Sequence, residues 1–283
     1  MALKLNGIID LIRIDGLMER MGLKKPETVG IAFGGGGARG FSHIGVLMAF
    51  QQFGIKPSVI SGVSAGSIAA VLYAAGLTPL DIRECFAEAG GLGDFREWAI
   101  PKDGFFKLDK FGKLLQKWLP VSRLEELKIP TVVCATNIDR ATQVGWCKGE
   151  IVPRVMASCS MPIIFKPISI NGYHYVDGGV LHNLPAWAIR DYCTTLFGSN
   201  CSPLDPDYKY KDSILDIASR TYQLVLKANV IQDQHLCDYV IKPKELARRK
   251  TFDLDSLDGN IQLGYEAACR VLERAMKHRD NSR

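Results

Sequence analysis

The segment at residues 60–75 constrains the fold most, because its character changes within a few positions. The apolar run that ends where it begins is typical of a buried strand, whereas residues 67–75 are small and apolar, as in a buried helix. Ser64 stands between them in a Gly-x-Ser-x-Gly pattern with Gly62 and Gly66. A serine on such a turn takes a strained backbone, and the two glycines let the flanking segments pass without a clash. We therefore expect the Ser64 hydroxyl to stand exposed at the positive end of a helix, as a nucleophile.

A second strand-turn-helix unit precedes this one. Residues 28–33 predict a buried strand, residues 34–40 read Gly-Gly-Gly-Gly-Ala-Arg-Gly, and an apolar helical pattern follows as far as Gly54. Such a turn can bind a pyrophosphate or donate N–H groups to an oxyanion. A dinucleotide site needs a carboxylate about 20 residues further on, and a P-loop needs a Gly-Lys-Ser or Gly-Lys-Thr ending; the sequence has neither. The oxyanion interpretation is therefore favoured, and a β-α-β crossover would bring both turns to one edge of a sheet.

The composition limits the possible partners. A chain of 283 residues can bury one large α/β core, and a net charge of +5 is too small to indicate nucleic acid as a partner. The eight cysteines are scattered, without C-x-x-C pairs or paired histidines, which indicates reduced thiols and a cytoplasmic protein. We expect no metal and no cofactor, and nothing in the sequence indicates the oligomeric state.

Two segments suggest contact with a membrane surface. Residues 1–26 predict an amphipathic helical extension, whose frequent charges exclude a signal-peptide core; no segment is apolar enough throughout to span a bilayer. Such a helix more often packs on its own domain than on a membrane. Residues 94–120 interleave aromatic side chains with lysines, which is typical either of ordinary packing or of a lid or lipid-facing patch.

Beyond residue 130, strand and helix patterns alternate, which indicates an α/β domain. The Asn171-Gly172 pair predicts a tight hairpin turn. The expected elements are strands at 131–137, 142–149, 194–198 and 238–242, and helices at 212–234 and about 257–277.

Four blocks in this order resemble the patatin-like phospholipase family, in its bacterial type. They are the glycine-rich run with its helix (34–47), Gly-Val-Ser-Ala-Gly (62–66), a proline-marked turn (156–167) and Asp-Gly-Gly (177–179). The resemblance implies a three-layer α/β/α sandwich with a mainly parallel central sheet, and hydrolysis of acyl esters of lipids. It implies one domain over residues 27–283, with the blocks inside 28–190 and a supporting α/β segment at 191–283 that contributes no obvious catalytic group.

The family's Ser-Asp dyad falls on two residues of this chain. The resemblance implies Ser64 as the nucleophile and Asp177 as the base, which later protonates the leaving alcohol. We expect an apolar pocket to raise the pKa of Asp177 from its ordinary value. The implied oxyanion donors are Gly35, Gly36 and Gly37, with Arg39 as a further candidate that could equally form a structural ion pair. The other motif glycines are Gly40, Gly62, Gly66, Gly178 and Gly179.

Alternatives stay open at this level. His174 and His182 flank Asp177 closely enough for a Ser-His-Asp triad. Ser158 and Ser160 lie in no glycine elbow, and we interpret them as packing residues. The chain could act as an esterase or thioesterase on small soluble esters, or bind lipid in a regulatory role. The sequence indicates neither the headgroup, nor the acyl-chain preference, nor the position of the ester that is cleaved.

Overall fold

The structure, a computed structural model, describes residues 28–91, 109–251 and 253–281. The predicted helical extension at residues 1–26 lies outside these ranges, as do residues 94–108 of the predicted lid or patch at residues 94–120. Among the helices of the described ranges, none combines the length and the apolar composition needed to cross a membrane.

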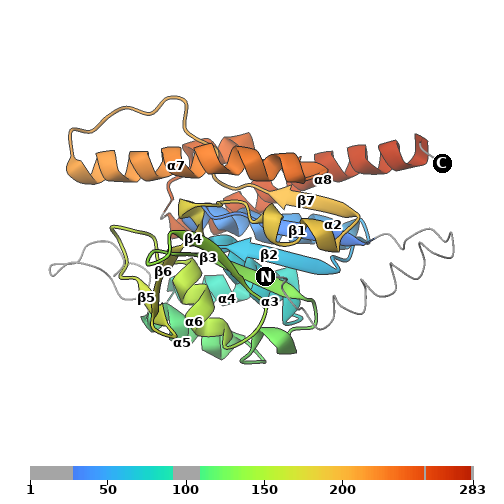
Figure 1. The fold of residues 1–283 in the computed structure, drawn as a ribbon. Coiled ribbons are helices and arrows are strands. Elements are labelled where there is room, and N and C mark those ends of the chain that lie inside the picture. The colour runs from blue at the N-terminus through green and yellow to red at the C-terminus, as the bar shows by residue number, and fades with distance from the viewer. Residues whose placement is uncertain (1–27, 92–108, 252, 282–283) are drawn as a thin grey trace.

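Within the described residues, a mainly parallel sheet of eight strands forms the centre of the molecule (Figure 1). Strands β1, β2, β3, β7 and β8 are parallel to one another, whereas β4 and β6 pair antiparallel with β3, and β5 pairs antiparallel with β6. The order is β5-β6-β3-β2-β1-β7-β8, with β4 also paired with β3. The bounds are Val29–Phe33 (β1), Val59–Val63 (β2), Thr131–Asn137 (β3), Thr142–Trp146 (β4), Ile168–Ile170 (β5), Tyr173–Asp177 (β6), Thr195–Ser199 (β7) and Tyr239–Ile241 (β8).

These strands confirm the ones predicted from the sequence, with ends that differ by a few residues. The predicted hairpin turn also lies in place, between β5 and β6. Its residues Asn171 and Gly172 have φ angles of 51° and 80°, as the two central positions of a type I′ turn require.

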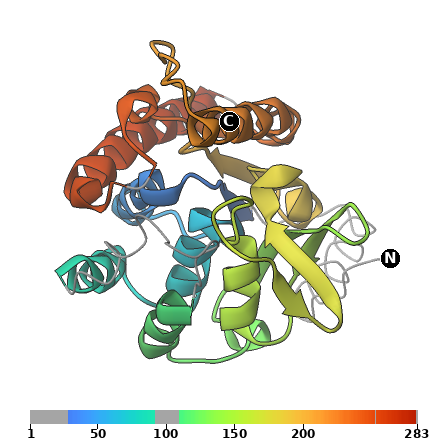
Figure 2. The ribbon, with the colours of Figure 1, turned by 90° about the vertical axis from the view of Figure 1, so that its left-hand side faces the viewer.

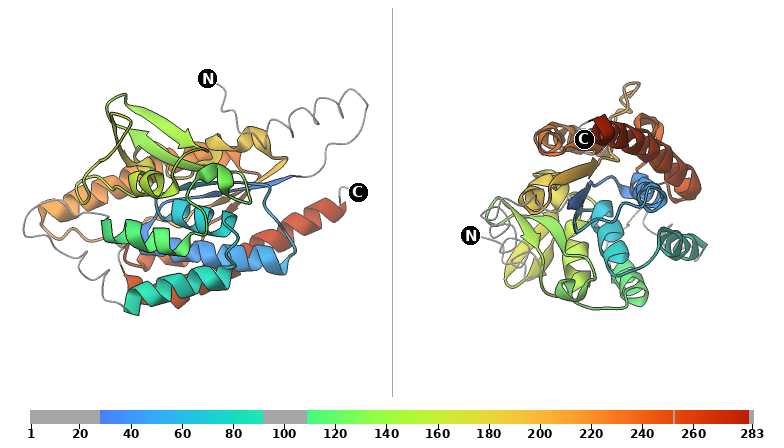
Figure 3. Two further views of the ribbon diagram at one scale, coloured as in Figure 1. Left: turned by 90° about the horizontal axis from the view of Figure 1, so that it is seen from below. Right: turned by 90° about the vertical axis from the view of Figure 1, so that its right-hand side faces the viewer.

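Helices cover both faces of the sheet, so the predicted three-layer α/β/α sandwich is confirmed (Figure 2). Of the helices in the described ranges, six pack on one face, namely α2, α3, α4, α5, α6 and α8; Figure 3 shows the molecule from below. Helix α7 covers the other face together with short 3₁₀ turns. The helix bounds are Ser42–Gln52 (α2), Ala65–Ala74 (α3), Pro79–Gly91 (α4), Asp109–Trp118 (α5), Ile151–Ser158 (α6), Ile214–Leu236 (α7) and Leu257–Asn281 (α8).

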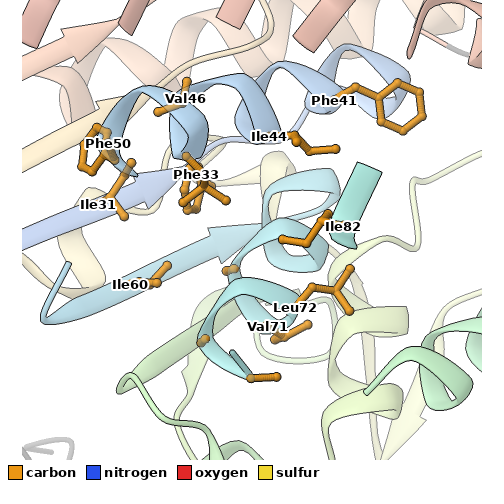
Figure 4. Packing of buried hydrophobic residues seen from close by; sticks show 14 of the residues in the cluster. Ile31, Phe33, Phe41, Ile44, Val46, Phe50, Ile60, Val71, Leu72 and Ile82 are labelled. Atoms are coloured by element: carbon orange, nitrogen blue, oxygen red, sulfur yellow. The ribbon is translucent and has the colours of Figure 1, made fainter. Parts of the chain in front are cut away.

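The larger apolar core lies between the sheet and the six-helix layer (Figure 4). Ile31 and Phe33 of β1 and Ile60 of β2 share it with Phe50 of α2 and Leu72 of α3, and all five side chains are fully buried. Burying each such side chain contributes about 1.5–3 kcal/mol. This packing fixes the strands whose ends carry the turns described below.

Helix α8 crosses α2 at very short range, through a glycine on each helix. A Cβ at Gly45 of α2 would lie 1.9 Å from the carbonyl oxygen of Ile261, and a Cβ at Gly264 of α8 would lie 2.0 Å from that of Ser42. No larger residue fits at either position without moving the backbone. Because α2 follows the glycine-rich turn, the crossing holds the helix that the turn leads into.

We expect Gly264→Ala to lower the free energy of unfolding by about 1–3 kcal/mol, because the added methyl group collides with the α2 backbone. Gly259→Ala is the matched control on the same helix. Its Cβ would meet only the guanidinium of Arg249, at 3.3 Å or more, and alanine is the better helix former by up to about 1 kcal/mol. Denaturant unfolding of both variants measures the difference; a Gly264→Ala protein as stable as the control would contradict the close crossing.

Candidate active site

Ser64 and Asp177 lie together because two strands share one edge of β3. Strand β2 pairs with β3 as far as Cys134, and β6 pairs with it from Ala135 onward, while β4 occupies the opposite edge. Since β2 runs parallel and β6 antiparallel to β3, the carboxyl ends of β2 and β6 face each other. Ser64 directly follows β2 and Asp177 is the last residue of β6.

The turn at Ser64 has the strained geometry predicted for it. Ser64 has a φ of 53° just before α3 begins, a conformation that costs about 1–3 kcal/mol in a residue other than glycine. A Cβ at Gly62 would lie 2.5 Å from the carbonyl oxygen of Gly66, and a Cβ at Gly66 would lie 2.2 Å from that of Phe33. Both positions therefore require glycine for steric reasons.

Ser158, at the end of α6, holds this turn in place. Its Oγ accepts a hydrogen bond from the Ser64 N–H at 2.8 Å and donates one to the carbonyl oxygen of Cys134 at 2.6 Å. The side chain is buried, as expected of a packing residue, but it also links the nucleophile turn to β3. Ser160 is buried as well, and its hydroxyl donates only to the carbonyl oxygen of Met156.

Asp177 is a buried carboxylate whose pKa is displaced toward neutrality. It is 3% exposed, and burial raises its pKa to about 6. The Ser64 hydroxyl and the Gly179 N–H, which donates to Oδ1 at 2.8 Å, act against this rise because they stabilise the charged form. A carboxylate with this pKa accepts a proton more readily at pH 7 than an ordinary one.

The histidines considered for a triad lie elsewhere. His174 pairs with Asp139 at 3.2 Å, and His182 pairs with Asp233 at 2.9 Å. His43 is fully buried, where its Nε2 contacts the carbonyl oxygen of Gly34, and burial lowers its pKa to about 4. In the part of the chain that the structure describes, no histidine lines the cavity that holds Ser64.

The glycine-rich turn offers fewer free N–H groups than its sequence suggests. The Gly35 N–H donates to the carbonyl oxygen of Asn183 at 3.1 Å, and the Asn183 Nδ2 donates back to Gly35 at 3.2 Å. The N–H groups of Gly36, Gly37 and Ala65 have no acceptor among the described residues. All three residues line the cavity with Ser64. Ala65 is the residue that follows the nucleophile, a position that commonly donates to an oxyanion.

Arg39 is engaged away from Ser64. Its buried guanidinium donates to the carbonyl oxygens of Arg249 at 2.8 Å, Pro203 at 3.2 Å and Ala247 at 3.5 Å. These contacts tie the turn to backbone carbonyls of the C-terminal part of the chain, and the described residues hold no ion pair of Arg39. The neighbouring Gly40 is packed against α3, since a Cβ there would lie 2.5 Å from that of Ala65.

The glycines after Asp177 are required by their neighbours. A Cβ at Gly178 would lie 2.5 Å from the Val63 side chain, and one at Gly179 would lie 2.7 Å from the Leu226 side chain of α7. The two glycines therefore let the end of β6 approach β2 on one side and α7 on the other.

The dyad opens into a mainly apolar cavity. Phe111 of α5 lies in its wall, so the described part of the predicted lid or patch segment contributes to the cavity. Tyr222 and Leu226 enter from α7, in the segment expected to contribute no catalytic group. The other apolar side chains of the wall include Phe41, Ile44, Ile68, Phe86, Met161, Phe165 and Leu204.

Comparisons with known proteins find a matching family model and several relatives. A family model described as patatin-like phospholipase matches residues 31–189. Lysophospholipase NTE1 of Candida glabrata is 31% identical over 199 residues, which are 66% of this chain and 11% of that protein. An uncharacterized NTE family protein of Mycobacterium bovis is 29% identical over 164 residues, 56% of this chain and 28% of that protein. The chain thus spans less than a third of the length of these curated relatives.

A solved structure shares the fold. VipD from Legionella pneumophila superposes with a TM-score of 0.51 and 13% sequence identity, and the match covers 89% of this chain and 67% of that one.

We expect Ser158→Ala to slow the reaction of Ser64 with a fluorophosphonate probe by about tenfold, because the Ser64 N–H loses its acceptor and the turn loosens. Ser160→Ala is the matched control, since each variant gives up a buried hydroxyl that donates to a carbonyl oxygen, at a cost of about 1–3 kcal/mol in stability. Labelling rates and thermal unfolding are measured for both. Equal labelling rates in the two variants would show that Ser158 acts on stability alone.

Proposed function

The chain belongs to the patatin-like phospholipase family, and on this basis we propose that it is a serine hydrolase of carboxylic esters in lipids and phospholipids, with Ser64 and Asp177 as its dyad. The observation that carries the proposal is the convergence of a strained serine and a buried carboxylate with a raised pKa inside one apolar cavity. A serine needs a neighbouring base to become a nucleophile at neutral pH. Asp177 is the base at hand, because His174 and His182 pair with other carboxylates and His43 contacts the carbonyl oxygen of Gly34.

Acylation begins when Asp177 takes the hydroxyl proton of Ser64 and Oγ attacks the ester carbonyl carbon. The carbonyl electrons move to oxygen, and the oxyanion accepts hydrogen bonds from the N–H groups of Gly36 and Gly37, which lack other acceptors among the described residues. The Ala65 N–H, at the head of α3, is a third donor on the same side. The intermediate then collapses, the ester C–O bond breaks, and Asp177 returns the proton to the leaving alcohol.

Deacylation repeats these steps with water. Asp177 accepts a proton from water while the water oxygen attacks the acyl-enzyme carbonyl carbon, and the same N–H groups bind the second oxyanion. Collapse breaks the bond to Ser64 Oγ, which regains a proton from Asp177, and the carboxylic acid leaves. In this scheme Gly35 and Arg39 position the turn, because their donors are bound to Asn183 and to the C-terminal loops.

The apolar wall supports an acyl chain as the group bound beside Ser64. Phe86 packs edge-on against Phe41, with 5.1 Å between the ring centroids, and at a tilt against Trp118, with 5.6 Å between them. Aromatic rings from α4 and α5 therefore extend this surface. The printed name of the Candida glabrata relative, a lysophospholipase, supports a phospholipid ester as the substrate. A small-ester esterase is the second candidate, and a lipid-binding regulatory role is the third.

Peripheral contact with a lipid surface is a further part of this proposal, and helix α7 is the surface that supports it. Along one face of α7, Ile214, Ile217, Leu224 and Ile231 recur at intervals of three and seven residues, and each is at least 49% exposed. The opposite face of α7 carries Tyr222 and lines the cavity. An amphipathic helix of this kind can lie in the plane of a membrane surface, where a lipid hydrolase finds its substrate.

We expect Ser64→Ala and Asp177→Asn each to reduce ester hydrolysis by more than about a thousandfold, because each removes one partner of a unit that acts together. Acyl release is measured from phosphatidylcholine vesicles, from lysophosphatidylcholine micelles and from a soluble short-chain ester. Intact mass after a fluorophosphonate probe should show one addition to the wild type and none to Ser64→Ala. Folded wild type that neither labels nor hydrolyses any substrate would favour the binding role, and activity on the short ester alone would favour the small-ester esterase.

We expect Ile217→Asp combined with Leu224→Asp to reduce vesicle hydrolysis at least about tenfold, because two apolar contacts with lipid are lost. Hydrolysis of the soluble ester should stay within about twofold, since both side chains face away from the cavity. Met276→Asp on α8, at a side chain 46% exposed, is the matched control. An unchanged vesicle rate would refute the contact. A change from dimer to monomer in sedimentation would instead make this face an interface between copies of the chain.

A further inference from the structure

Helix α7 lies against the Asp177 turn along one face, although it lies beyond the residues that the family model matches. Tyr222, Leu226, Asn229 and Asp233 are spaced by four, three and four residues, which puts them on one side of a helix. Each contacts the chain near Asp177. This face of α7 therefore lies against the segment that follows Asp177.

Asn229 makes the firmest of these contacts. Its Nδ2 donates to the carbonyl oxygens of Gly179 at 2.6 Å and Val180 at 3.3 Å, and its Oδ1 accepts the Asn183 N–H at 2.9 Å. Since Asn183 also holds Gly35, one α7 side chain connects the Asp177 turn with the glycine-rich turn. The position of α7 relative to Asp177 is thus fixed by hydrogen bonds.

Leu226 and Asp233 make further contacts on either side of Asn229 along α7. The Leu226 side chain packs on Gly179, where a Cβ would lie 2.7 Å from it. Asp233, 1% exposed, pairs with His182 at 2.9 Å. Tyr222 lies one turn before Leu226 on the same face, so its side chain reaches the turn at Asp177 itself.

The Tyr222 hydroxyl is a buried donor without a committed partner. It is shielded from solvent and completes no well-formed hydrogen bond among the described residues. It lies beside the Asp177 carboxylate, in the wall of the cavity that holds Ser64. A buried hydroxyl without a partner is destabilising, which indicates that this one has a role at the site.

We propose that Tyr222 is a positioning residue of the dyad: its O–H donates to the Asp177 carboxylate, keeps it ionised and turns it toward Ser64. The inference rests on the proposed hydrolase function. Oδ1 of Asp177 already accepts the Gly179 N–H at 2.8 Å, and the hydroxyls of Ser64 and Tyr222 face the same carboxylate. Donation to a carboxylate stabilises its charged form and opposes the effect of burial.

The other groups around Asp177 do not titrate where it does. The titratable side chains that face it are Tyr222 from α7 and Cys159 from the end of α6; the Ser64 hydroxyl and the Gly179 N–H are the uncharged groups that face it. Burial raises the pKa of Cys159 well above its ordinary value, and burial beside the carboxylate does the same for Tyr222. Both therefore stay neutral at pH 5–8. Asp177 alone then sets the acid limb of the pH–rate profile, the range in which the rate rises with pH.

The test is the pH dependence of fluorophosphonate labelling and of soluble-ester hydrolysis in Tyr222→Phe. In the wild type both rates should rise with half their change near pH 6, as Asp177 loses its proton. Removing the donor destabilises the carboxylate, so the limb should move to higher pH by about one unit, which is about a tenfold loss at pH 5. At pH 9 the variant should stay within about threefold of the wild type.

Tyr265→Phe is the matched control, because that α8 tyrosine also loses a hydroxyl contact, to Gln52, far from the dyad. Its limb should not move. Thermal unfolding of both variants measures any purely structural effect of the substitution, which would lower stability without moving the limb.

Two results would overturn the proposal in different ways. If the wild type labels with an acid limb near pH 6 and Tyr222→Phe leaves that limb in place, or loses activity equally at every pH, the positioning role is wrong and the hydrolase function stands. If the folded wild type does not label at all, the proposed function fails, and the positioning role fails with it.

Discussion

The site depends on one feature of strand pairing, the meeting of β2 and β6 along a single edge of β3. Val63, the last residue of β2, pairs with Cys134, and Asp177, the last residue of β6, pairs with Ala135. The carboxyl ends of β2 and β6 therefore lie beside neighbouring residues of β3. The hydrogen bonds of β3 with these two strands thereby bring together a serine and a carboxylate that are more than a hundred residues apart in the sequence. Ser158 stabilises the end of β2 further, since its hydroxyl bonds both the Ser64 N–H and the Cys134 carbonyl oxygen of β3.

The segment after the motif blocks stabilises both turns of the site. The Arg39 guanidinium fastens the glycine-rich turn to backbone carbonyls of two C-terminal loops. Asn229 of α7 fastens the turn after Asp177, and α8 crosses α2 where Gly264 meets the backbone of Ser42. The N–H groups that stay free are those of Gly36, Gly37 and Ala65, as far as the described residues go.

A dyad without histidine needs a carboxylate that is both ionised and basic, and these two demands conflict. Burial makes Asp177 more basic, while the hydrogen bonds around it keep it charged. The balance leaves its pKa at about 6, close to the pH at which the reaction would run. His43 cannot take this role, because it is fully buried beside Gly34 and its pKa is lowered to about 4.

The sequence by itself determined the local features of this protein. The strands, the turn at Asn171 and Gly172, and the need for glycine at Gly62 follow from φ angles and side-chain volumes of residues that are close together in the chain. The order of the motif blocks was enough for the three-layer fold and for the pairing of Ser64 with Asp177 as candidates.

Only the tertiary structure decided how the donors and bases are shared. The Gly35 N–H is bound to Asn183, the Arg39 side chain to distant carbonyls, and each candidate histidine to a carboxylate of its own. Tyr222 reaches Asp177 from helix α7, which carries no sequence motif. The only sequence signal is the spacing of three and four residues that puts Tyr222 on the same side of the helix as Leu226 and Asn229. The physical reason is the same throughout: a hydrogen bond between residues far apart in the chain depends on the packing of whole elements, and local sequence carries no record of it.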